Sequence, residues 1–132
     1  MAFFPAVGQA FNRTRQACLA TDLAIADTFW TRFRGLLGLK ADDFRNGCGL
    51  WIVPCSGVHT HGMGFAIDVI YLDQAMTVID VRPALKPWRI GPVRRRATSV
   101  LELPCNVAAE TGTAVGDTIE ITLPKDCHTP VA

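Results

Sequence analysis

Apolar residues gather in the middle of the chain, in two short runs at residues 50–53 and 65–72. The second run is rich in β-branched and aromatic residues, a composition typical of a buried strand. In the glycine-rich segment between the runs, His59 and His61 fall on one side of an extended chain because successive side chains alternate. We therefore predict two buried strands joined by a glycine-rich corner, residues 57–68, which we call the corner.

The flanking patterns predict further short strands and one helix. Apolar residues at helical spacing after Asp27 and Thr28, both suitable N-caps, indicate a helix over residues 28–37. We interpret Arg32 and Arg34 as part of its solvated face; the alternative is phosphate binding by this arginine-rich segment. Strands are expected at residues 17–26, 77–81, 99–103 and 118–123. Six or seven short strands with one early helix favour a mainly β fold, either a β-sandwich or a small barrel.

The length of 132 residues is typical of one domain. We expect that domain to span residues 17–123, after a poorly anchored segment, 1–16, and before a tail without pattern, 124–132. No apolar run is long enough to span a bilayer. The five cysteines are widely spaced and form no C-x-x-C pair, which favours free thiols in a reducing, cytoplasmic setting.

Asp68 is the one acidic residue inside the second apolar run. Because its neighbours on both faces of the strand are apolar, we expect its carboxylate to be buried and to need hydrogen-bond donors. The candidate donors are Thr60, His59, His61 and backbone N–H groups of the corner. The favoured interpretation is a structural aspartate that holds a bend; the functional alternative is a ligand or proton-handling site.

A basic segment, residues 82–96, follows the central strands. No acidic residue occurs between Asp80 and Glu102, and three prolines argue against a regular central strand. We predict an exposed loop. It is either simply solvated or a contact for nucleic acid or another anionic partner through Arg94, Arg95 and Arg96.

Several motifs occur in a fixed order: RGLLG at 34–38, GLWI at 49–52, HTxxMxFxIDVIYLD at 59–73, LELP at 101–104 and GD at 116–117. Together they resemble the bacterial and archaeal domain-of-unknown-function family 192. The resemblance implies a small, mainly β domain of the jelly-roll type, and it supplies no activity. It points to Thr60, Met63, Asp68 and Glu102.

Two positions depart from the family pattern. His61 stands where the family usually has an aromatic residue such as phenylalanine, and Cys105-Asn106 replaces the usual Ala-Gly. Any role for His61 or Cys105 would therefore be particular to this chain.

Three functional hypotheses follow, with enzyme status, cofactor and oligomeric state left open. The first is a small-ligand pocket at the corner, formed by Thr60, Met63, Asp68, Glu102 and His59, with Trp51 or Trp88 as an apolar wall. The second is a metal site, hydrolytic in one version, that uses His59, His61 and Asp68, with Cys55 as a further candidate ligand. The third is a non-enzymatic interaction module that uses the basic loop, residues 82–96.

Overall fold

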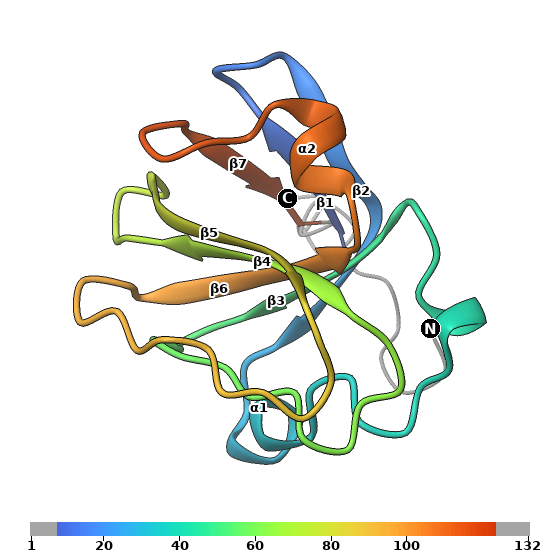
Figure 1. The fold of residues 1–132 in the computed structure, drawn as a ribbon. Helices are drawn as coiled ribbons and strands as arrows, with labels where there is room; N and C mark the ends of the chain where they lie inside the picture. Colours follow the sequence, from blue (N-terminus) through green and yellow to red (C-terminus); the bar gives the residue numbers. More distant parts are fainter. Residues whose placement is uncertain (1–7, 124–132) are drawn as a thin grey trace, which may run out of the picture.

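A computed structural model describes residues 8–123 of the chain (Figure 1). Its strands form one seven-stranded sheet in the order β5-β4-β6-β3-β2-β1-β7. The strands are β1 (Gly8–Asn12), β2 (Ala17–Ala26), β3 (Cys48–Ile52), β4 (Ile67–Leu72), β5 (Val78–Leu85), β6 (Ser99–Pro104) and β7 (Ile119–Thr122). β2 and β3 pair in parallel, and the other neighbours pair antiparallel. The predicted mainly β fold is confirmed.

The sheet curls into a half-barrel, so that its two edge strands, β5 and β7, approach each other. Near the start of β5 and β7, the backbone N–H of Val78 donates to the carbonyl of Asp117 at 2.8 Å, and that of Ile119 donates to the carbonyl of Met76 at 2.9 Å. These bonds satisfy backbone groups that an edge strand would otherwise leave open to pairing with another chain.

β1 differs from the prediction that residues 1–16 would be poorly anchored. It lies between β2 and β7, and the fully buried Asn12 donates through Nδ2 to Thr113 and Asp117, each at 3.0 Å. The Arg15 guanidinium and Asn12 hold the pKa of the Asp117 carboxyl at about 2. Residues 1–7 and the predicted tail, 124–132, lie outside the described residues.

The two faces of the sheet carry separate hydrophobic clusters. Because side chains alternate along each strand, β6 sends Leu101 and Leu103 to one face and Val100 and Glu102 to the other. We call these the Asp68 face and the Glu102 face. The Asp68 face is covered at one end by α2 (Val107–Thr111), and the Glu102 face by the chain that follows α1 (Phe29–Arg34) and η1 (Ala41–Asp43). Figure 1 shows α1 and α2 at opposite ends of the sheet.

The helix and the basic segment also differ in detail from the sequence analysis. α1 ends at Arg34, earlier than predicted, because Gly35 adopts a non-helical backbone conformation with a positive φ of +50° and ψ of −130°. β5 extends through Pro83 to Leu85, into the predicted loop. An edge strand tolerates proline since part of its backbone has no ladder partner. Across residues 8–123, no helix is long and apolar enough to cross a membrane. The cytoplasmic location stays a prediction.

Asp68 connects three elements of the fold on the Asp68 face. It is fully buried, as predicted. The backbone N–H of Ala84, in β5, donates to Oδ1 at 2.9 Å, and that of Ala108, in α2, donates to Oδ2 at 2.9 Å. The hydrogen-bond donors to Asp68 are therefore neither the side chains of Thr60, His59 and His61 nor backbone N–H groups of the corner. The structure supports the interpretation of Asp68 as a structural residue that ties β4 to β5 and α2.

Replacing Asp68 with alanine should lower the free energy of unfolding by roughly 3 kcal/mol, because two N–H groups lose their acceptor. Urea denaturation followed by tryptophan fluorescence measures this loss. Asp22→Ala, at an exposed position of β2, is the matched control and should change stability little. Equal stability of the Asp68 and Asp22 variants would contradict the structural role of Asp68.

Candidate functional site

A cavity of about 60 Å³ lies on the Glu102 face, between α1 and the chain after β3. Its walls come from residues 32–37, residues 55–59 of the β3–β4 connection, and the side chains of Ile52, Met63 and Glu102. The cavity adjoins a wider surface groove of about 570 Å³, which shares Arg32, Ile52, Cys55 and Gly57 with it.

Glu102 brings a carboxyl group into this cavity from the middle of the sheet. It lies in β6, opposite Leu50 of β3 and Val69 of β4, and is 4% exposed. Its Oε1 atom is buried and has no hydrogen-bond partner among the described residues. Burial raises the pKa of Glu102 to about 8, since a charged carboxylate is poorly solvated there. The group is therefore mostly protonated at neutral pH.

Arg32 reaches the same cavity from α1. Its Nη1 donates to the carbonyl of Pro54 at 3.3 Å, and its Nε is buried without a partner among residues 8–123. Arg34 also lines the cavity, and both side chains are partly buried. The prediction of a solvated arginine face is thus wrong, because the short helix is packed against the β3–β4 connection. The RGLLG motif, which contains Arg34, was the available sequence signal.

Cys55 lines the cavity as a neutral thiol. Burial raises its pKa, and the Glu102 carboxylate, once ionised, acts in the same direction. Its Sγ donates to the carbonyl of Gly57 at 2.9 Å. A thiol with a raised pKa is a weak nucleophile and a weak metal ligand because both roles need the thiolate.

An exposed row of rings runs from the edge of the cavity. His59, which lines the cavity, stacks on His61 with ring centroids 5.4 Å apart, and His61 contacts Trp88 at 5.8 Å. Thr60, between the histidines, is buried. Its hydroxyl donates to the carbonyl of Lys86 at 2.6 Å and accepts from the backbone N–H of Arg89 at 2.9 Å. Thr60 thus fastens the corner to the loop after β5.

The structure brings together three of the six predicted pocket residues. His59, Met63 and Glu102 line the cavity. Asp68 lies on the other face, as does Trp51, which packs against the Leu101 cluster. Asp68 and Glu102 were expected in one pocket, but they point to opposite faces of neighbouring strands.

The predicted metal site is not assembled. His59 and His61 are neighbours at the surface, but both carboxylate oxygens of Asp68 accept backbone N–H groups on the far side of the sheet. Within residues 8–123, no group of three or more His, Cys, Asp or Glu side chains is placed to hold a metal ion. Cys55 donates its proton to Gly57 instead.

The basic loop is anchored to the sheet at several points. Arg94 and Arg82 each donate through Nε to Oδ2 of Asp80, at 2.9 and 3.1 Å. Tyr71 donates to the carbonyl of Pro92 at 2.7 Å, and burial raises its pKa to about 12. Of the three arginines predicted to meet a partner, Arg94 is thus held within the molecule, while Arg95 and Arg96 are exposed.

Comparison with known proteins identifies the family. The model of domain-of-unknown-function family 192, described as Uncharacterized ACR, matches residues 10–121. This chain belongs to that family. The match begins within β1, so the family domain includes the strand that the motifs did not reveal.

Two archaeal relatives extend the comparison. The UPF0127 protein of Pyrococcus abyssi is 40% identical over 121 residues, which cover 86% of this chain and 97% of that protein. The UPF0127 protein of Thermococcus sibiricus is 32% identical over 114 residues, covering 83% of this chain and 71% of that protein. Among solved structures, a protein of unknown function from Novosphingobium aromaticivorans has a TM-score of 0.76 at 18% identity, over 87% of this chain and 84% of the other. The last comparison shows the shared fold.

The raised pKa of Glu102 should make the stability of this protein depend on pH. The folded chain holds the proton up to about pH 8, whereas the unfolded chain releases it near 4.5. The contribution is full below pH 4.5 and is lost as pH rises toward 8, by at most about 5 kcal/mol. The free energy of unfolding of the wild type, minus that of Glu102→Gln, should therefore fall over this range.

Glu110→Gln changes an exposed glutamate of α2 and should leave the pH dependence intact. A wild-type curve that runs parallel to the Glu102→Gln curve between pH 5 and pH 8 would show that Glu102 titrates normally.

Proposed function

We propose that this protein binds a small ligand in the cavity between α1, the β3–β4 connection and Glu102. The observation that carries the proposal is that Glu102 lines the cavity and that its buried Oε1 atom has no partner among the described residues. Buried polar atoms in folded proteins nearly always have a hydrogen-bond partner, so an unpaired carboxyl oxygen is expected to meet one that enters from outside.

The chemistry of the walls supports a binding site. Apolar side chains of Ile52, Leu36 and Met63 surround a few polar groups, which is the usual composition of a small-molecule site. A bound water needs roughly 10–15 Å³ of such space, so a cavity of about 60 Å³ holds a group of a few heavy atoms. A larger ligand would extend into the adjoining groove.

Glu102 is also suited to exchange a proton with a bound ligand. A carboxyl group with a pKa near neutrality can give or take a proton in the physiological range. The neutral Cys55 thiol supplies no activated nucleophile beside it. The proposal is therefore for binding, with Glu102 as the polar contact.

The proposal predicts that small probes perturb Glu102 in the wild-type protein. NMR of protein labelled with ¹³C at the glutamate side-chain carboxyl carbon measures this directly, with propionate, propionamide, propylamine and propanol added in turn. At least one probe should shift the Glu102 signal and leave that of exposed Glu110 unchanged. Glu102→Leu, followed through backbone amide signals of residues 55–59, should lose that response, while Glu110→Leu keeps it. Absence of any Glu102 response to all four probes would refute the pocket.

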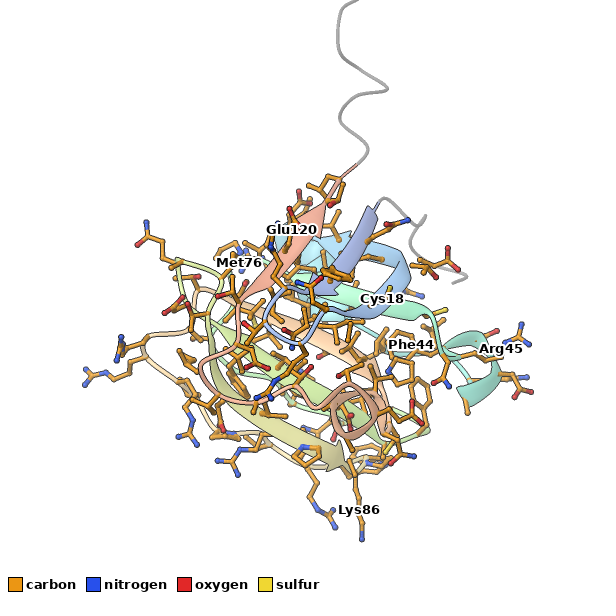
Figure 2. All side chains as sticks on the ribbon, turned by 90° about the horizontal axis from the view of Figure 1, so that it is seen from above. Cys18, Phe44, Arg45, Met76, Lys86 and Glu120 are labelled. Atoms are coloured by element: carbon orange, nitrogen blue, oxygen red, sulfur yellow. The ribbon has the colours of Figure 1, made fainter. Side chains whose placement is uncertain are left out.

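A second candidate function rests on side chains that the basic loop exposes. Trp88 is 64% exposed, Ile90 74% and Val93 66%, and all three lie between exposed cations. The cations are Lys86, Arg89, Arg95 and Arg96; Figure 2 shows Lys86 projecting away from the body. Apolar side chains flanked by positive charge fit an anionic lipid surface, which accepts both. Docking on such a surface is the function that this loop supports.

Vesicle sedimentation tests the docking function. Binding to vesicles containing phosphatidylglycerol should exceed binding to phosphatidylcholine vesicles, and should fall with salt. Arg95→Glu with Arg96→Glu, and Trp88→Ala, should each reduce it at least several-fold. Lys40→Glu with Arg45→Glu, the control pair at exposed positions around η1, should not. Equal binding to both vesicle types, or binding to single-stranded DNA alone, would overturn the lipid assignment.

A further inference from the structure

We propose that the ligand of the cavity is a small carboxylate anion, held by the Glu102 carboxyl group and the Arg32 guanidinium. This inference rests on the proposed ligand site and adds the chemical class of its occupant. It follows from the charges that line the cavity and from the hydrogen-bonding groups that they leave unpaired.

The ionisable groups that face the cavity carry net positive charge. α1 contributes Arg32 and Arg34, the β3–β4 connection contributes Cys55 and His59, and β6 contributes Glu102. On the strands beside β6, the positions opposite Glu102 are apolar, Leu50 in β3 and Val69 in β4. Of these groups, the Arg32 guanidinium has no ion-pair partner among the described residues. With Glu102 protonated, an anion is the ligand that balances the charge of Arg32.

The unpaired polar groups supply two hydrogen-bond donors. The Arg32 Nε–H is buried without a partner among the described residues, and a protonated Glu102 has an O–H to donate. The Cys55 thiol donates to Gly57 and competes with neither. A ligand group that accepts hydrogen bonds and carries negative charge pairs with both donors and balances Arg32. A carboxylate has two such oxygens, and a hydrogen bond from a charged or acidic donor to a carboxylate is among the strongest in proteins.

Other ligand classes fit less well. An ammonium group offers only donors and carries the same charge as the arginines. A primary amide could pair with both the O–H and the carbonyl oxygen of protonated Glu102, but it leaves the charge of Arg32 without a counterion. A carboxylate also fits the size, since a cavity of about 60 Å³ holds a planar group of three atoms with a short apolar stem.

The arrangement makes binding depend on the proton of Glu102. Above its pKa, the Glu102 carboxylate repels the ligand carboxylate; below it, the two share one proton in a hydrogen bond. The dissociation constant for propionate should therefore be roughly tenfold larger at pH 9 than at pH 7, when the pKa of Glu102 is about 8. By linkage, bound propionate should raise the pKa of Glu102 further.

The experiment titrates sodium propionate, propionamide and propylamine into the full chain at pH 6, 7, 8 and 9, with total ionic strength held constant by sodium chloride. The Glu102 carboxyl ¹³C signal reports both its titration and its occupancy. We expect propionate to bind more tightly than either neutral or cationic analogue at pH 7. Its affinity should decline above pH 8, and the Glu102 pKa should rise in its presence.

Two variants separate the contributions. Glu102→Gln keeps a donor but loses the titrating proton, so propionate should bind with no pH dependence between pH 7 and pH 9. Arg32→Gln should weaken propionate at least tenfold and leave propionamide unchanged. Arg45→Gln, at an exposed position away from the cavity, is the matched control. Each variant is compared with the wild type in thermal unfolding, so that a folding defect is recognised.

The outcomes distinguish the two proposals. Tighter binding of propionamide than propionate, or propionate binding that is indifferent to pH and to Arg32→Gln, overturns the carboxylate assignment while the cavity remains a ligand site. Failure of all three probes to perturb Glu102 overturns the carboxylate assignment, and failure of propanol as well overturns both.

Discussion

The alternation of side chains along β4 and β6 is the constraint on which the rest of this structure depends. The two strands are neighbours at the centre of the sheet, with Val69 opposite Glu102 and Asp68 opposite Leu103. Because the period is two, this register sends the two buried acids to opposite faces. A shift by one residue would exchange the core and site positions of an entire strand.

The two acids show how burial alone does not decide the role of a carboxyl group. Asp68 and Glu102 are both almost inaccessible to water. Asp68 accepts two backbone N–H groups and thereby joins β5 and α2 to the sheet. Glu102 has an oxygen with no partner among the described residues, faces a cavity, and holds its proton to about pH 8. The first group is satisfied by the protein, and the second is open to a ligand.

The loop after β5 and the corner together form the protein surface beside the cavity. Thr60 binds the loop after β5 through its hydroxyl and backbone, and Tyr71 fixes the same loop at Pro92. These bonds hold His59, His61 and Trp88 in one row beside the cavity. Thr60 is thus a positioning residue for the surface near the site, although its hydroxyl is already engaged.

Membership of family 192 fits a division between the curled sheet, which is the scaffold, and the cavity, which is the candidate site. The family model spans β1 to β7, so the curled sheet is the common element. The solved structure from Novosphingobium aromaticivorans keeps the fold at 18% identity, which shows that the sheet tolerates wide changes of sequence. The chemistry of the cavity therefore has to be established from its own residues.

The sequence by itself determined the mainly β character, most strands and the burial of Asp68, because alternation and β-branched runs are local signals. The ordered motifs also pointed to Glu102 and Met63, and the His-x-His pattern of the corner pointed to His59. Only the tertiary structure decided that β1 belongs to the sheet, that Asp68 faces away from Glu102, and that Arg32 reaches the cavity. Each of these depends on pairing or packing between segments distant in the chain, such as β1 with β7, and no local pattern encodes that register.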